Sequence, residues 1–338
     1  MKEEDFWHRL KVDLRLITNM ENNVLLVGCG EIGSRHLQAL VKINNIKINI
    51  IEPSLESRKI AIERISEITN KDQKLFWYNS INEVKNKMKL VIVATLAVNR
   101  VEQIISLLEK GHKKFLIEKM VCQSDEQYKL LLSKIKEYEA VGWVNVSRRY
   151  FPVYQNIKKM IEQTNTTHIS IIIGNRGLGT VAVHYLDLFS WFTENIDIKL
   201  SGEYLLEKLF PNKRDDNLIE FRGTITAKIK NGSSLMITSI PDSDLPIIIN
   251  IKNNSDFIIY DEINMNMITQ NTKSIKSDFK FEHISSTTTK IVLDILKNEN
   301  CLLPKVEELY NIHSELFKIF NTHIKEKTGI AKKVCPIT

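Results

Sequence analysis

From Asn22 to about Val146, short apolar runs alternate with stretches whose apolar positions recur every three or four residues. The runs predict buried strands, and the periodic stretches predict helices that cover them. Repeated strand–helix units with short connections are typical of a parallel, doubly wound α/β sheet. The predicted strands are 24–27, 46–51, 75–78, 90–94, 114–117 and 140–146, with helices at 32–43, 54–65, 98–110 and 124–139 between them.

The pattern changes after about residue 148. Two helical stretches, 152–161 and 184–192, flank a strand at 168–173, and few helical signals follow until residue 268. Asn231-Gly232 predicts a hairpin turn between alternating segments on either side. The remaining predicted elements are strands at 221–229, 235–240, 247–251, 257–260 and 264–268, and helices at 286–297 and 305–325. This predicts an α+β domain with a large open, mostly antiparallel sheet and helices on one face.

We therefore expect three parts: an N-terminal helical extension over 1–21, a doubly wound α/β domain over 22–147 and an α+β domain over 148–338. Apolar residues recur at helical spacing in the extension, at Phe6, Leu10, Leu14 and Ile17. This spacing predicts an amphipathic helix that packs on the body of the protein or on another subunit.

The first strand leads directly into Gly28-Cys-Gly30-Glu31-Ile32-Gly33, a G-x-G-x-x-G motif at the start of a helix. In this context Gly28 allows a sharp turn, Gly30 lets a pyrophosphate approach the backbone, and Gly33 allows close packing of helix on strand. The unpaired N–H groups of the helix N-terminus favour an anion. We expect Glu31 and Ile32 to contact the cofactor as well.

Glu52 ends the second strand, about 20 residues beyond the last glycine, where a carboxylate can accept hydrogen bonds from ribose hydroxyls. A 2′-phosphate would be repelled there, so NAD is favoured over NADP. The alternative interpretation is that Glu52 only begins the turn Glu52-Pro53-Ser54.

Ligands of open α/β sheets bind at the carboxyl ends of the strands. Thr95 follows the fourth strand, and Glu118-Lys119 follows the fifth. Partial burial and a nearby nicotinamide cation would lower the pKa of Lys119 toward a value useful for general acid–base catalysis. An ordinary exposed loop lysine is the alternative.

Two further pairs of residues are candidates for the active site. His184 and Asp187 lie three residues apart on one predicted helix face, where the acid can orient the imidazole or hold a neighbouring backbone group; a structural histidine is the alternative. Arg148 and Arg149 follow the sixth strand and can reach a substrate phosphate or carboxylate. For these arginines, surface charge or an inter-domain salt bridge is an equal alternative.

Composition narrows the class of protein. The chain has 338 residues, of which 43% are hydrophobic and 26% charged, with a formal net charge of +6. These values are typical of a globular protein of two domains. The N-terminus lacks an apolar signal core, and no apolar run is long enough to span a bilayer, so we expect a cytoplasmic protein. Dispersed lysines without a basic stripe argue against nucleic-acid binding, and four scattered cysteines predict neither zinc nor disulfides.

Several of these motifs together resemble the Gfo/Idh/MocA oxidoreductase family. They are Gly28-Cys-Gly-Glu-Ile-Gly33-Ser-Arg-His-Leu, Ala94-Thr95, Glu118-Lys119 and His184-Tyr-Leu-Asp187-Leu. The resemblance implies a Rossmann dinucleotide-binding domain over 22–147 and a substrate-binding and oligomerisation domain over 148–338, which often associates through its sheet to give a homodimer or homotetramer. Members mostly oxidise or reduce a hydroxyl of sugars, inositols or sugar nucleotides with NAD(P). By this resemblance the family's catalytic lysine corresponds to Lys119 and its active-site histidine to His184.

The sequence departs from the family pattern at two positions. Met120 stands where proline usually follows the lysine, and Thr180 stands where many members carry an aspartate four residues before the histidine. The resemblance is to a subset found among bacterial surface-polysaccharide genes. Its shared residues include Trp143-Val-Asn145, Arg148-Arg149, Pro152, Gly174-Asn175 and Gly177-Leu178.

The leading hypothesis is an NAD-dependent dehydrogenase of a sugar, sugar nucleotide or acidic sugar, without a metal, in bacterial surface-glycan biosynthesis. Its catalytic residues would be Lys119 and His184, and its substrate contacts Arg148, Arg149 and Asp187. The alternatives are an imine or C=C reductase of the same family, a non-catalytic NAD-binding sensor or scaffold, and, from the glycines and acid alone, a methyltransferase that uses S-adenosylmethionine.

Overall fold

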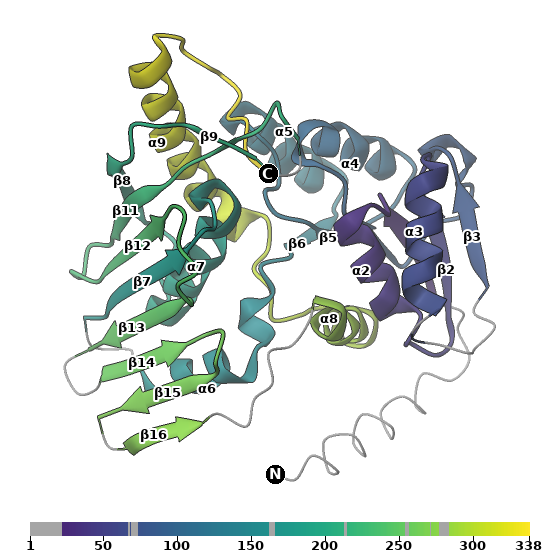
Figure 1. Ribbon diagram of the computed structural model, residues 1–338. Coiled ribbons are helices and arrows are strands. Elements are labelled where there is room, and N and C mark those ends of the chain that lie inside the picture. The colour runs from purple at the N-terminus through teal and green to yellow at the C-terminus, as the bar shows by residue number, and fades with distance from the viewer. Residues whose placement is uncertain are drawn as a thin grey trace.

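The computed structural model describes residues 22–66, 68, 74–161, 166–212, 215–253, 257–270, 272–276 and 284–338 (Figure 1). The helix predicted over 1–21 lies outside these residues. Two large sheets dominate the described chain, each belonging to one lobe in Figure 1.

The first sheet is parallel and has the strand order β3-β2-β1-β4-β5-β6. This is the doubly wound arrangement that the sequence predicts, with its switch point between β1 and β4. Its strands are β1 (Asn22–Val27), β2 (Ile46–Ile51), β3 (Leu75–Tyr78), β4 (Leu90–Val93), β5 (Lys114–Ile117) and β6 (Val141–Val144).

Helices cover both faces of this sheet, and every residue of β4 is buried. The N-cap Ser124 hydroxyl accepts a hydrogen bond from the Gln127 N–H at 3.1 Å, which is one half of a capping box. The helices are α2 (Glu31–Leu40), α3 (Leu55–Ser66), α4 (Arg100–Glu109) and α5 (Asp125–Glu137), with short 3₁₀ turns η1 (Ile81–Glu83), η2 (Ala97–Asn99) and η3 (Ser147–Tyr150).

The second sheet has the order β16-β15-β14-β13-β7-β12-β11-β8. Its neighbours pair antiparallel except β7 and β12, which are parallel, so the prediction of a mostly antiparallel sheet is confirmed. The strands are β7 (His168–Gly174), β8 (Lys199–Leu205), β11 (Gly223–Lys228), β12 (Ser234–Ile240), β13 (Ile248–Lys252), β14 (Phe257–Asp261), β15 (Asn266–Thr269) and β16 (Thr272–Lys276). A separate small ladder joins β9 (Phe210–Pro211) to β10 (Ile219–Glu220).

The helices α6 (Pro152–Met160), α7 (Leu178–Thr193) and α9 (Tyr310–Thr328) lie on one side of this sheet (Figure 1). The predicted hairpin at Asn231-Gly232 joins β11 to β12, and Gly232 has φ +91°. Two helices begin five or more residues away from their predicted starts. The first, α7, begins six residues earlier than expected. The second, α9, begins five residues later, because Lys305 pairs with Trp143 beside β6 and η4 (Glu307–Leu309) intervenes.

One C-terminal helix packs against the first domain, although its sequence lies in the segment predicted for the second. The helix α8 (Ile284–Asn298) packs against α2, and Ile291, Val292 and Ile295 join the buried cluster of β1 and β4. Figure 1 shows α8 between the two lobes and beside α2. This part of the predicted segment 148–338 therefore contributes to the core of the first domain.

Candidate active site

The glycine loop has the shape of a pyrophosphate cradle. Gly28 turns the chain with φ +82°, and a Cβ built on Gly33 would meet the Gly28 carbonyl oxygen at 2.0 Å. No described atom lies within 4 Å of a Cβ built on Gly30, so the backbone there is open to a ligand. Gly30 caps α2, whose first residues are the exposed Glu31 and the half-buried Ile32. These features fit a dinucleotide whose phosphates face the helix N-terminus.

Glu52 is buried and contacts the glycine loop directly. One carboxylate oxygen accepts a hydrogen bond from the Cys29 N–H at 2.7 Å, and the other accepts from the Ser54 N–H at 2.9 Å. The acid therefore closes its own turn, as the alternative interpretation describes, and also braces the glycine loop. Its contact with ribose hydroxyls stays a prediction. Cys29 packs as a buried thiol, and burial followed by the charge of Glu52 raises its pKa to about 12.

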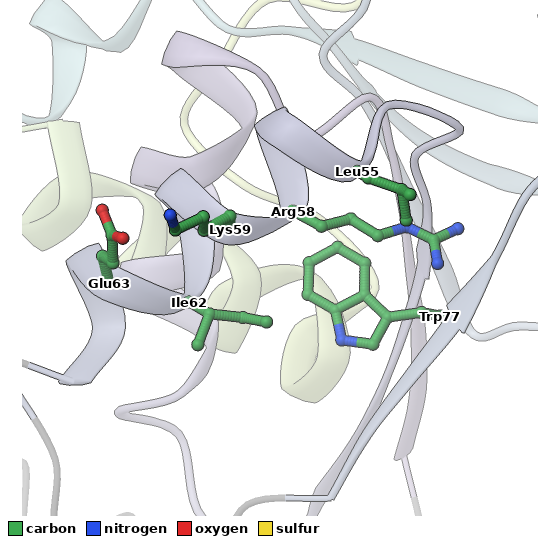
Figure 2. Close-up of a pocket in the computed structure, with 6 residues that line it drawn as sticks. All are labelled: Leu55, Arg58, Lys59, Ile62, Glu63 and Trp77. Atoms are coloured by element: carbon green, nitrogen blue, oxygen red, sulfur yellow. The ribbon is translucent and has the colours of Figure 1, made fainter.

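A groove near Glu52 lies between α3 and β3. Figure 2 shows the Arg58 side chain beside the Trp77 ring, with Leu55 and Ile62 along the helix. Arg58 donates to the Glu52 carbonyl oxygen at 2.6 Å and to the Tyr78 carbonyl oxygen at 2.9 Å. The guanidinium thus fixes the ends of β2 and β3.

Glu118 ties the loop after β5 to the glycine-loop helix. Its carboxylate contacts His36 Nε2 of α2 at 2.9 Å and accepts a hydrogen bond from Asn145 Nδ2 at 2.5 Å. His36 Nδ1 lies 3.0 Å from the Thr288 hydroxyl of α8. Burial alone would raise the pKa of Glu118, but His36, Asn145 and the charge of Lys119 together lower it to about 2.

The buried Arg100 supports the same loop from α4. Its guanidinium donates to the carbonyl oxygens of Glu118, Met120 and Thr95, the first at 2.5 Å. The Thr95 hydroxyl donates to Gln103 at 2.7 Å. The ends of β4 and β5 are therefore joined through one cation.

Lys119 is only 8% exposed, so it is not an ordinary surface lysine. Its Nζ donates a hydrogen bond to the Thr338 carbonyl oxygen at 3.2 Å. The following Met120 is fully buried, and the Lys119–Met120 peptide bond is cis.

Glu220 is an acid near Lys119 that the sequence analysis missed. Its carboxylate accepts hydrogen bonds from the Thr180 hydroxyl and from Asn212 Nδ2, the latter at 3.0 Å. Burial raises its pKa, while Thr180 and the charge of Lys119 act in the opposite direction. The only signal in the sequence is a lone acid in an otherwise apolar stretch, 218–221.

Glu220 also explains the glycines at the start of α7. A Cβ on Gly177 would meet Glu220 Oε2 at 1.8 Å, and one on Gly179 would meet it at 3.0 Å. The carboxylate thus lies against the helix N-terminus, where a negative charge is favoured. Position 180 carries no acid itself, but its threonine holds one that comes from β10.

The predicted partner of His184, Asp187, pairs with an arginine in the structure. Asp187 is fully buried and accepts two hydrogen bonds from Arg149, at 3.0 and 2.6 Å, so the pair joins η3 to α7. Burial raises the pKa of Asp187 to about 6 against the effect of Arg149. His184 is half-buried and lies one helical turn from Thr180.

Arg148 makes a second link of the same kind. Its guanidinium lies 3.0 Å from Glu262 and donates to the Tyr185 hydroxyl at 3.1 Å, and Tyr185 in turn donates to Glu262 at 2.7 Å. Burial disfavours the charge of Arg148, yet Glu262 and Tyr185 raise its pKa above the ordinary value. Both arginines form salt bridges, but their acidic partners lie in the same segment, 148–338, and not across the domain boundary. Their contact with a substrate stays a prediction.

Three observations on the described residues concern metal ligands, membrane-spanning helices and disulfide bonds. They contain no cluster of three or more His, Cys, Asp or Glu side chains suited to a metal ion. None of the described helices combines the length and apolar character needed to cross a bilayer. All four cysteines are free thiols.

Comparison with known proteins places this geometry in context. Residues 22–146 match a sequence model described as "Oxidoreductase family, NAD-binding Rossmann fold". No curated protein sequence matches the chain.

Several solved structures share the fold across both domains. UDP-N-acetylglucosamine 3-dehydrogenase from Acidithiobacillus ferrooxidans is 12% identical with a TM-score of 0.69, covering 89% of this chain and 97% of that one. The WlbA dehydrogenase from Bordetella pertussis, solved with NADH and UDP-GlcNAcA, is 15% identical with a TM-score of 0.68, covering 94% and 99%. Biliverdin reductase from Synechocystis, solved with biliverdin and NADP+, is 13% identical with a TM-score of 0.66, covering 88% and 98%. At these identities the likeness is one of fold.

Proposed function

We propose that this chain, whose residues 22–146 are an NAD-binding Rossmann domain of the Gfo/Idh/MocA oxidoreductase family, transfers a hydride between nicotinamide and a hydroxyl or keto carbon of a sugar, sugar nucleotide or acidic sugar. A role in bacterial surface-glycan biosynthesis follows from the subset that the sequence resembles.

The observation that carries this proposal is the placement of Lys119. It is buried at the end of β5, and its neighbour Glu118 is bonded to His36 on the helix of the glycine loop. A group capable of proton transfer is therefore fixed relative to the dinucleotide cradle, at the edge of the sheet where such folds bind ligands.

The chemistry of the chain's own residues is proton transfer. Bound NAD supplies the hydride acceptor or, when reduced, the donor. During oxidation Lys119 Nζ takes the proton of the substrate hydroxyl, and during reduction it returns a proton to the same oxygen. We assign His184 as a second hydrogen-bonding group for that oxygen. General acid–base catalysis of this kind contributes about 10²–10⁴-fold to the rate.

The proposed preference for NAD over NADP rests on Glu52. Its carboxylate is held at the end of β2 by two backbone N–H groups. A 2′-phosphate near it would place two negative charges close together, which is unfavourable.

The proposed substrate class rests on the resemblance to sugar dehydrogenases. Two solved structures with this fold are a UDP-N-acetylglucosamine 3-dehydrogenase and a dehydrogenase bound to UDP-GlcNAcA. The residues near Lys119 come from both domains, since Glu220 and Thr338 belong to the second.

We also propose that the protein is a homodimer or homotetramer that associates through the second sheet. The face of this sheet away from α7 and α9 carries exposed apolar side chains on several strands. They are Tyr204, Met236, Phe257, Ile259 and Ile268. Such a patch favours protein–protein contact.

Native mass spectrometry of the freshly purified protein, followed by turnover assays with sugar nucleotides, keto sugars and imines, tests the function. Lys119→Met should bind NADH normally and lose at least about 100-fold in kcat, whereas Lys129→Met, at an exposed position on α5, should match the unchanged protein. Normal turnover in Lys119→Met refutes the catalytic assignment. Imine turnover without keto-sugar turnover favours the reductase alternative, and NADH binding without any turnover favours a sensor.

A further inference from the structure

Three of the four residues 335–338 are buried, and Pro336 is half-buried, although the segment belongs to no helix or strand. Cys335 and Ile337 are fully buried, and Thr338 is only 2% exposed. Figure 1 shows this end of the chain next to α5 and between the two lobes. A short irregular segment is buried at low cost only when its backbone polar groups find partners.

The backbone of this segment is bonded to both domains. On the Rossmann side, the Cys335 N–H donates to the Gln123 carbonyl oxygen at 2.7 Å, and Gln123 Nε2 donates to the Ile337 carbonyl oxygen at 2.9 Å. On the other side, the Ile219 N–H donates to the Pro336 carbonyl oxygen at 2.7 Å. The segment therefore spans the junction between the domains.

The same segment surrounds the proposed catalytic lysine. The Thr338 carbonyl oxygen accepts the hydrogen bond from Lys119 Nζ. A Cβ on Gly179 would lie 3.0 Å from both the Ile337 side chain and the Glu220 carboxylate, so Ile337 packs where α7 begins. Lys119, Glu220 and the segment thus form one buried cluster.

We propose that residues 335–338 are a positioning segment of the active site, which orients Lys119 Nζ and fixes the second domain against the loop that carries it. This proposal rests on the proposed function of Lys119. A backbone oxygen accepts but cannot donate a hydrogen bond, so its contact with Lys119 Nζ fixes the direction of one N–H of the amine. A small misplacement of a reacting group lowers kcat far more than it weakens cofactor binding.

Two variants test the segment. The first ends the chain after Val334, and the second, Gln123→Leu, keeps the whole chain but removes the side-chain hydrogen bond to Ile337. The exposed Lys332→Ala, just before the segment, is the matched control. We expect kcat to fall about 10- to 100-fold in the shortened chain and about 3- to 10-fold in Gln123→Leu. The KM for NADH should be unchanged in both, and Lys332→Ala should match the unchanged protein.

Labelling of Lys119 by an amine reagent, mapped by mass spectrometry, provides a readout that needs no turnover. Labelling should rise at least about 10-fold in the shortened chain relative to Lys129, because the buried amine loses its cover and its acceptor. A peptide of residues 332–338 added to the shortened chain should restore protection.

The outcomes separate this proposal from the proposed function. If the wild-type protein binds NADH but turns over no substrate, the proposed function is overturned. The labelling of Lys119 then decides whether residues 335–338 position that lysine. If kcat and Lys119 labelling are unchanged in the shortened chain, the positioning role is overturned. If that chain does not fold, as judged by NADH binding and thermal unfolding, Gln123→Leu decides by the same two measurements.

Discussion

The charge of Glu118 should stabilise the fold as well as the site, and Glu118→Gln tests this. The carboxylate is bonded to His36 and Asn145, and the Rossmann core closes around it. Glutamine has nearly the same shape, so the variant removes the charge while leaving the packing intact.

The size of the effect follows from the pKa. Contacts with His36, Asn145 and Lys119 hold the pKa of Glu118 at about 2, against an ordinary value of 4.5. At about 1.4 kcal/mol for each pKa unit, this difference corresponds to roughly 3 kcal/mol of stability at neutral pH. Because the pKa is lower in the folded state, the stabilisation is present above about pH 4.5 and is lost as the pH falls toward 2. About 1 kcal/mol of it is gone by pH 4.

Urea unfolding at pH 7 and pH 4 measures this directly. Glu118→Gln should be less stable than the unchanged protein by about 3 kcal/mol at pH 7, and the gap should narrow by about 1 kcal/mol at pH 4. Glu137→Gln is the control, because that side chain is half exposed and pairs with Lys134 on the surface of α5. Its effect should stay within about 0.5 kcal/mol. A Glu118→Gln gap that is the same at both pH values would show that the charge carries none of this stability.

Two further variants test the cofactor preference and the assembly. Glu52→Gln should improve NADPH binding relative to NADH by about 10-fold, because the repulsion of the 2′-phosphate is removed; fluorescence titration measures both affinities, and the exposed Glu56→Gln should leave their ratio unchanged. Ile259→Lys should reduce the molar mass found by light scattering to that of a smaller assembly, since a charge then faces the apolar patch. Leu130→Lys, at an exposed position of α5, should not, and an Ile259→Lys mass equal to that of the unchanged protein would refute association through this face.

Local signals were sufficient to predict most of the first domain. Strands at 46–51, 75–78 and 114–117 have the predicted bounds, because polar and turn residues on either side mark where each strand begins and ends. The glycine spacing also predicts the geometry of the loop, since Gly28 has a positive φ and a Cβ on Gly33 would clash with the Gly28 carbonyl oxygen.

The second domain was harder to predict because its pairing is non-local. The parallel neighbour of β7 is β12, which lies about 60 residues further along the chain. The position of α8 against α2 likewise depends on contacts across some 250 residues, such as that between Thr288 and His36. Periodicity finds such elements but does not say which surface each one covers.

By itself, the sequence determined the dinucleotide loop, the acid after β2 and the lysine after β5. Each of them directly follows a strand whose end can be recognised from the residues around it in the sequence. Only the tertiary structure decided what surrounds them. It paired Asp187 with Arg149, brought Glu220 to Thr180, and placed residues 335–338 over Lys119. The physical reason is that a buried polar group takes whichever partner the packed chain brings within reach, and spacing along the sequence does not record that choice.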